Sequence, residues 1–180
     1  MNINLVKVRR MPDRRQRLEE HRNRNCLFCQ IQEHLKDTEA YRNLNVGQSD
    51  VCFAILDRNP KALGHCLVIA KAPFNDFTDN LTDIEESEKT TVFKEAIELS
   101  RKLKEVLKAE KVYIMSMCEH WQMWETSDGV TTEHLHFHLV PRYDGMRNKF
   151  DAAERLLARD GKEQTKEALQ NTAKLLNEHK

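Results

Sequence analysis

Residues 134–138 read His-Leu-His-Phe-His, and this run decides how the rest of the chain is interpreted. Side chains alternate between the two faces of an extended strand, so the pattern predicts that His134, His136 and His138 line one face. The apolar side chains between them would then anchor the strand in the core. Successive imidazoles are expected about 6.5–7 Å apart, which is twice the strand rise. The run therefore predicts a row of titratable groups on a rigid support.

Three interpretations of this row of imidazoles are open from the residues alone. A neutral imidazole is nucleophilic near pH 7, and closely spaced imidazoles do not all carry a charge. We expect the middle histidine, His136, to attack an electrophilic phosphorus, while His134 and His138 neutralise phosphate charge or protonate the leaving group. The spacing is also typical of zinc ligands, although no acidic ligand follows closely. The third interpretation is a polar sheet face without chemistry.

The composition excludes several classes of protein. Lys plus Arg equals Asp plus Glu at 29 each in 180 residues, so no overall charge favours nucleic acid or a membrane surface. Residues 1–24 nevertheless hold eight basic and three acidic residues, a net charge of +5, and form either a solvated arm or one that contacts a polyphosphate, an acidic partner or RNA. No apolar run suits a membrane span or a signal peptide, and five cysteines do not favour a disulfide scaffold, so we expect a cytoplasmic protein.

Hydrophobic periodicity predicts an α+β domain built on an antiparallel sheet of about five strands. One long helix is predicted over residues 83–110, where an apolar stripe recurs at spacings of three or four residues. Shorter helices are predicted over residues 11–22, 30–36, 151–159 and 163–179. Strands are predicted over residues 40–46, 50–57, 65–71, 112–118 and 133–142, with a turn at residues 47–49.

A second motif, Cys26-X-X-Cys29, is typical of one half of a tetrahedral zinc site. Such a site needs two more ligands, and the sequence holds no second Cys-X-X-Cys. Two buried cysteines without a metal ion are the alternative. The histidines that would complete a zinc site are His65, His134, His21 and His34.

Together these motifs resemble the histidine triad (HIT) superfamily. The run His-Leu-His-Phe-His-Leu-Val-Pro-Arg over residues 134–142 is similar to the family signature, in which apolar residues alternate with three histidines. Residues 52–60 and 64–71 resemble the family's two central strands, and residues 26–31 resemble the opening segment of its zinc-binding members. The resemblance covers residues 24–145. It leaves a basic N-terminal arm, residues 1–23, and a C-terminal helical extension, residues 146–180.

The resemblance implies a HIT-like sheet with one long helix packed on it, in a nucleotide hydrolase or nucleotidyl transferase that acts at the α-phosphate of a nucleotide. Dinucleoside polyphosphates and nucleoside phosphoramidates are the implied substrates. It also implies a nucleotidyl-histidine intermediate on His136, contacts from His138 to the phosphate and leaving group, a structural zinc ion and a two-fold homodimer. The implied zinc ligands are Cys26, Cys29, His65 and His134. The implied nucleotide-binding residues are Leu27, Phe28, Ile55, Asp57 and Thr131.

The chain departs from the family pattern just before the triad. Gly129-Val-Thr-Thr-Glu stands where many members have Gly-Gln-Ser, so Thr131 is the only hydroxyl at the serine position. Two alternatives to a hydrolase therefore stay open. In a phosphorylase or nucleotidyl transferase, phosphate or another acceptor would replace water in resolving the intermediate. In a zinc-stabilised nucleotide-binding module, the basic arm would regulate a partner and His136 would be dispensable.

Overall fold

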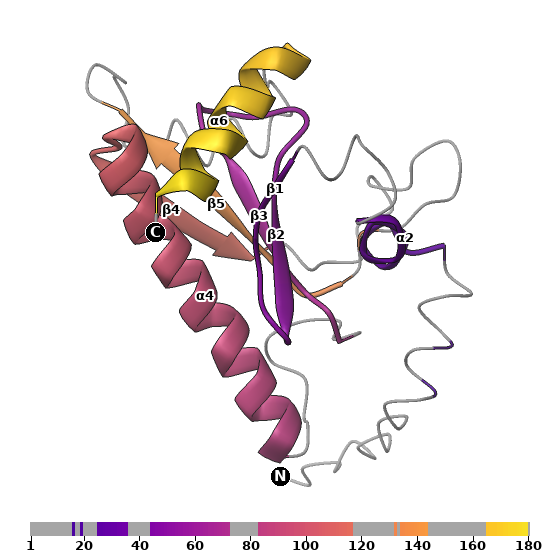
Figure 1. The fold of residues 1–180 in the computed structure, drawn as a ribbon. Coiled ribbons are helices and arrows are strands. Elements are labelled where there is room, and N and C mark those ends of the chain that lie inside the picture. The colour runs from indigo at the N-terminus through magenta and orange to yellow at the C-terminus, as the bar shows by residue number, and fades with distance from the viewer. Residues whose placement is uncertain are drawn as a thin grey trace, which may run out of the picture.

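The computed structural model of the chain describes residues 25–35, 44–72, 83–116, 132, 134–143 and 165–179, together with Gln16 and Glu19. Its strands are β1 (Asn45–Gln48), β2 (Cys52–Leu56), β3 (Cys66–Ala70), β4 (Lys111–Ser116) and β5 (His136–Arg142). Its helices are α2 (Leu27–His34), α4 (Asp83–Leu107) and α6 (Lys166–Glu178). The five strands form one antiparallel sheet in the order β1-β2-β3-β5-β4 (Figure 1). The predicted α+β class and antiparallel sheet are confirmed.

The middle of the sheet is made by β2 and β3, in which every residue is buried. Ile55 of β2 lies opposite Leu67 of β3, and Leu67 lies opposite His138 of β5. Directly opposed residues of antiparallel strands point to the same face. The register therefore places Ile55 and His138 in one row on one face of the sheet.

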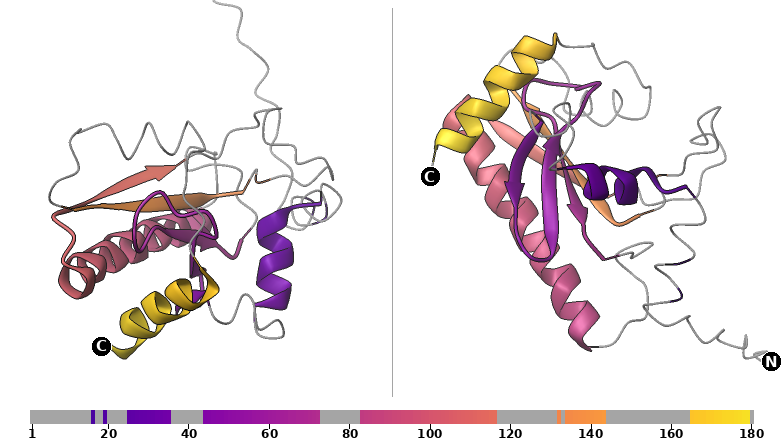
Figure 2. Two further views of the ribbon diagram at one scale, coloured as in Figure 1. Left: turned by 90° about the horizontal axis from the view of Figure 1, so that it is seen from above. Right: turned by 45° about the vertical axis from the view of Figure 1, so that its right-hand side comes forward.

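The long helix α4 covers the other face of the sheet, as the apolar stripe predicts. Its buried Val92, Ala96 and Leu103 belong to the hydrophobic core, and the ring of Phe93 lies 5.5 Å from that of Phe137 in β5. In Figure 1 and in the right-hand view of Figure 2, α4 and α2 lie on opposite sides of the strands. The sheet thus separates a helix-covered face from the face that carries His136 and His138.

The C-terminal helix α6 packs against β1 and α4. It begins after Thr165, whose hydroxyl accepts a hydrogen bond from the backbone N–H of Ala168. Near its end, Nδ2 of Asn177 donates to the carbonyl of Asn45 at 2.9 Å. This helix confirms the predicted one over residues 163–179 apart from its ends. Of the helix predicted over residues 11–22, the structure describes only Gln16 and Glu19, both helical, and the helix predicted over residues 151–159 lies outside the described residues.

The first hairpin differs from its prediction. Gly47 and Gln48, expected in the turn, belong to β1 and lie opposite Ala54 and Phe53. The chain reverses at residues 49–51 instead, because the backbone N–H of Ser49 donates to the carbonyl of Cys52 at 2.9 Å and closes the turn there.

Candidate functional site

Two histidines of the run lie side by side on β5. The rings of His136 and His138 have their centroids 4.9 Å apart, and their Nε2 atoms are 3.2 Å apart. This is closer than the 6.5–7 Å expected from the strand rise, because the two side chains lean toward each other. Phe137 points to the opposite face, where it contacts α4. The alternation that the sequence predicts is therefore present for this pair.

His136 is held in one tautomer by the backbone. Its Nδ1–H donates to the carbonyl oxygen of His134 at 2.7 Å, and a carbonyl only accepts, so Nδ1 carries the proton. In the neutral ring, Nε2 then carries the lone pair, which faces His138. The side chain is 3% exposed, and burial lowers its pKa to about 4 against the pull of the backbone hydrogen bond. At neutral pH this imidazole is uncharged and has the electronic form of a nucleophile.

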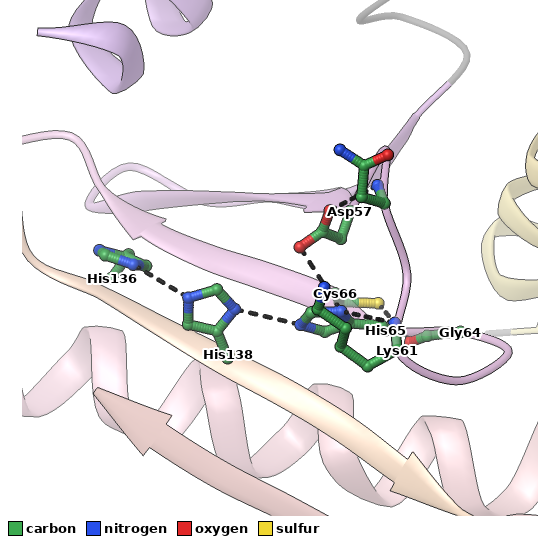
Figure 3. Close-up of polar contacts among 8 residues, drawn as sticks. Asp57, Lys61, Gly64, His65, Cys66, His136 and His138 are labelled. Carbon is green, nitrogen blue, oxygen red and sulfur yellow. Dashed lines mark hydrogen bonds and ion pairs between the residues drawn. The ribbon is translucent and has the colours of Figure 1, made fainter. Parts of the chain in front are cut away.

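Beyond His138 lies a fourth histidine, His65, which comes from the residue just before β3. Its Nε2 is 3.1 Å from Nδ1 of His138, and its Nδ1 is 3.4 Å from Oδ2 of Asp57 (Figure 3). Burial lowers the pKa of His65 to about 4, although the Asp57 carboxylate raises it. The pKa of His138 also lies well below its usual value, first because of burial and then because of His136 and His65. The site is a chain of neutral imidazoles that ends at a carboxylate.

His134 does not join this chain of imidazoles. Its Nδ1 lies 3.5 Å from Sγ of Cys26 and 3.6 Å from Sγ of Cys29, and its Nε2 lies 2.6 Å from the carbonyl oxygen of Ala70. The carbonyl requires a proton on Nε2, so in the neutral ring the lone pair of Nδ1 points at the two sulfurs. Cys29 belongs to α2, so these contacts attach α2 to the sheet.

The cysteines and His134 form a candidate metal site. Zinc binds sulfur at about 2.3 Å and nitrogen at about 2.0–2.1 Å, so a tetrahedral ion would hold them about 3.5 Å apart. The observed separations of 3.5 and 3.6 Å fit this value. A hydrogen bond from the second ring nitrogen to a carbonyl is also the usual support of a metal-binding histidine. The donor set and its geometry therefore suit zinc.

The structure does not bring His65 to the cysteines, although the sequence analysis places it among the zinc ligands. The two ends of β3 decide this, because His65 lies where β3 begins whereas His134 contacts Ala70, where β3 ends. His65 contacts Asp57 and His138 instead. Within the described part of the chain, the group of possible ligands around the cysteines has three members.

The other predicted residues surround the same face. Phe28 of α2 lies over His136, with the ring centroids 4.7 Å apart, and Ile55 shares the row of His138. Leu27 is partly buried and packs against the core. Asp57 follows the last residue of β2, and its Oδ1 accepts a hydrogen bond from the N–H of Asn59 at 2.7 Å. Thr131 and His21 lie outside the described residues.

The contact between His65 and His138 is the feature that sequence reasoning missed. The two residues are 73 positions apart, and no motif spacing links them. Only the pairing of β3 with β5, which sets Cys66 opposite Leu139, brings them together.

Comparison with known proteins gives the family. A family model described as the HIT domain matches residues 38–145, which is more than half of the chain. An uncharacterized HIT-like protein of Mycoplasma pneumoniae is 30% identical over 123 residues, which cover 68% of this chain and 74% of that protein. A similar protein of Borreliella burgdorferi is 28% identical, over 66% of this chain and 76% of its own. The chain therefore belongs to the HIT family.

Solved structures show the same fold. A hypothetical histidine triad nucleotide-binding protein from Sulfolobus tokodaii aligns with a TM-score of 0.61 and 24% identity, over 85% of this chain and 90% of that one. A zinc-bound histidine triad family protein from Mycobacterium smegmatis aligns with a TM-score of 0.57 and 23% identity, over 85% and 91%. Among the helices that the structure describes, none is long and apolar enough to cross a membrane.

Proposed function

We propose that this protein is a nucleotide hydrolase that splits a dinucleoside polyphosphate or a nucleoside phosphoramidate at the α-phosphate. The observation that supports it best is the pair of Nε2 atoms of His136 and His138, 3.2 Å apart on a buried face of the sheet. A nucleophile and a proton donor within hydrogen-bond reach are what nucleotidyl transfer to histidine requires. Membership of the HIT family agrees with this chemistry.

In the proposed reaction, the lone pair on Nε2 of His136 attacks the α-phosphorus. The bond from phosphorus to the leaving group breaks, and His138 protonates the leaving atom. A water molecule then attacks the phosphorus and gives one proton to His138, while the bond from phosphorus to Nε2 breaks and its electron pair returns to His136, which releases the nucleoside monophosphate. The carbonyl of His134 holds the proton of His136 on Nδ1 throughout, so that Nε2 alone reacts.

The nucleotide would bind between α2 and the face of the sheet that carries His136 and His138. Phe28, Leu27 and Ile55 supply apolar surface for a nucleoside, and Asp57 supplies a carboxylate at the end of β2 for hydroxyl groups. We assign Thr131, which lies outside the described residues, to the phosphate side on the resemblance alone. We also propose that the protein is a homodimer and that it is cytoplasmic.

We also propose that zinc is the structural cofactor, held by Cys26, Cys29 and His134. When bound, the ion would hold α2 against the sheet and take no part in the chemistry. Its role would be indirect, because Phe28 of the same helix covers His136.

Hydrolysis is tested by incubating the protein with diadenosine tetraphosphate or adenosine phosphoramidate, with and without inorganic phosphate. We expect AMP without added phosphate, and a loss on the order of 10⁴-fold or more in His136→Ala. His179→Ala removes an exposed histidine at the end of α6 and is the matched control. Phosphate-dependent release of ADP would identify a phosphorylase instead, and full activity in His136→Ala would contradict the proposed nucleophile.

A further inference from the structure

The first turn of α2 places two sulfur atoms near each other. Cys26 is the N-cap of the helix and has extended backbone angles, φ −68° and ψ 119°, while Cys29 is the third residue of the helix. The backbone N–H of Gln30 donates to the carbonyl of Cys26 at 3.1 Å and begins the helical hydrogen bonding. The two Sγ atoms lie within 4.8 Å of each other and are not joined by a disulfide. A Cys-X-X-Cys motif at a helix N-terminus is typical of cysteines that form a reversible disulfide.

The other two cysteines that the structure describes do not share this arrangement. Cys52 lies opposite Ala70, and Cys66 lies opposite Leu56, so the two cysteines stand four positions apart along the strands. Four strand rises are about 13 Å, whereas the Cα atoms of a disulfide lie about 4.4–6.8 Å apart. Both cysteines are also buried, whereas Cys29 is partly exposed. Among the described cysteines, an oxidant from solvent therefore reaches Cys29 first.

We propose that Cys26 and Cys29 are a thiol–disulfide site, which a small-molecule disulfide closes and a thiol reopens, and that its closure weakens nucleotide binding. The link to nucleotide binding rests on the proposed function and deepens it. Leu27 and Phe28, which we assign to the nucleoside, are the two residues between the cysteines. The oxidation state of the pair therefore acts directly on the turn that carries them.

Oxidised glutathione is a suitable oxidant, and the reaction takes two steps. The sulfur of Cys29 attacks one glutathione sulfur, and the other leaves as a thiolate with the electron pair of the broken sulfur–sulfur bond. The sulfur of Cys26 then attacks Cys29 in the mixed disulfide and expels the second glutathione thiolate. Two electrons pass from the protein to glutathione, and the two thiol protons, where no metal is bound, pass to the glutathione thiolates. An excess of thiol reverses both exchanges.

Closure of the disulfide removes the attachment of α2 to His134. A disulfide has no S–H to donate, and only a thiolate is an effective metal ligand. The contacts of the two Sγ atoms with Nδ1 of His134, at 3.5 and 3.6 Å, therefore no longer hold as hydrogen bonds or as parts of a zinc site. Oxidation should release any zinc that the reduced protein holds.

The same change moves the side chain that covers His136. Sulfur atoms that lie within 4.8 Å of each other must come to about 2.05 Å, so the turn between them tightens. Phe28 lies in that turn, and its ring is 4.7 Å from the ring of His136 and 6.0 Å from that of His134. Displacement of this ring alters the apolar surface offered to a nucleoside, so oxidation should lower the affinity for a nucleotide.

The first measurement follows the pair itself. The zinc-loaded protein is incubated with oxidised glutathione, its remaining thiols are alkylated, and it is digested with trypsin, which cuts after Arg24 and Lys36. Peptide 25–36 contains Cys26, Cys29 and no other cysteine. We expect it to escape alkylation, to be about 2 Da lighter than the reduced peptide, and to form as zinc is released. A peptide that stays fully alkylated, or that carries only glutathione, would overturn the disulfide site.

The second measurement is the affinity for AMP, determined by titration calorimetry on the reduced and the oxidised protein. We expect the dissociation constant of AMP to rise by about fivefold or more on oxidation and to return to its first value with dithiothreitol. An unchanged affinity in the fully disulfide-bonded protein would overturn the link to nucleotide binding. A reduced protein that does not bind AMP would instead contradict the proposed function, and the peptide measurement would still decide the disulfide.

Two variants separate the pair from the other cysteines. Cys29→Ser lacks one partner of the disulfide, so its affinity for AMP should be the same with and without oxidant. Cys52→Ala removes a buried cysteine outside the pair and should respond to oxidant as the wild type does. A response to oxidant that persists in Cys29→Ser would assign the effect to another cysteine and overturn the proposal.

Discussion

The carbonyl oxygen of His134 accepts a hydrogen bond from Nδ1–H of His136 at 2.7 Å, while the side chain of His134 contacts Cys26 and Cys29. One residue therefore joins the candidate metal site to the proposed nucleophile. The side chain fixes the position of residue 134, and its backbone fixes the tautomer of residue 136. A change at the cysteines should thus alter the position of His136 through the backbone of residue 134.

Removing the metal should lower stability. We expect a chelator, or Cys26→Ser, to lower the free energy of unfolding by about 4 kcal/mol if the metal is present at a thousand times its dissociation constant. Metal content by mass spectrometry and denaturant unfolding measure this effect. His65→Gln is the informative comparison, because the structure places His65 away from the sulfurs. Loss of metal from His65→Gln would contradict the ligand set proposed for this site.

Phe28→Ala should affect both stability and nucleotide binding. Phe28 is buried, and its ring lies 4.7 Å from that of His136, so truncation should cost about 3 kcal/mol and raise KM. Urea unfolding and steady-state kinetics report the two effects. Phe93→Ala is the matched control on the opposite face, where the ring is more exposed. It should cost less stability and leave KM unchanged, and an equal rise in KM would argue against a nucleotide beneath α2.

Gly64→Ala should destabilise the fold because two effects act at this position. The residue has φ +77°, and a Cβ there would overlap Cδ1 of Leu107 in α4. We expect a loss of at least about 2 kcal/mol from backbone strain and crowding. Gly47→Ala is the control, since its Cβ would meet its nearest neighbour, Ala54, at 3.9 Å. Thermal unfolding of the two variants side by side measures the difference, and equal melting temperatures would contradict the close packing of the loop on α4.

Acid should destabilise the protein through its buried histidines. The pKa of His65 is about 4 in the folded protein and 6.5 in its ordinary state, so the unfolded chain binds more protons between these values. Stability should therefore fall as the pH drops from about 6.5 to 4, by up to about 1.4 kcal/mol per pH unit for each such histidine. Unfolding at several pH values in the presence of a chelator measures this slope, and the chelator removes the contribution of metal release.

The matched variants for the acid effect are His138→Gln and His34→Gln. His138 is also held neutral by burial, so its replacement should make the slope shallower. His34 is exposed on α2, and its replacement should leave the slope as it is. If stability falls with pH equally steeply in the wild type and in both variants, acid destabilises the protein through groups other than His138.

Local periodicity was sufficient to predict most of the elements. The apolar stripe of α4 and the unbroken apolar run of β3 were recognised because each depends on neighbouring residues only. The first hairpin was misplaced because hydrogen bonds of Ser49 to Cys52, and not the glycine at position 47, set the turn. The side-chain spacing in the triad was also wrong, since rotamers rather than the strand rise decide how close two rings come.

By itself, the sequence determined the histidine row, the cysteine pair and the alternation that puts imidazoles on one face and Phe137 on the other. These features follow from the fixed geometry of a strand, which any stretch of chain obeys. Only the tertiary structure decided how the four central histidines divide between two tasks. Pairing of β3 with β5 sets His65 beside His138 at the start of β3 and His134 beside Ala70 at its end. Strand register depends on contacts between residues far apart in the chain, so spacing along the sequence does not reveal it.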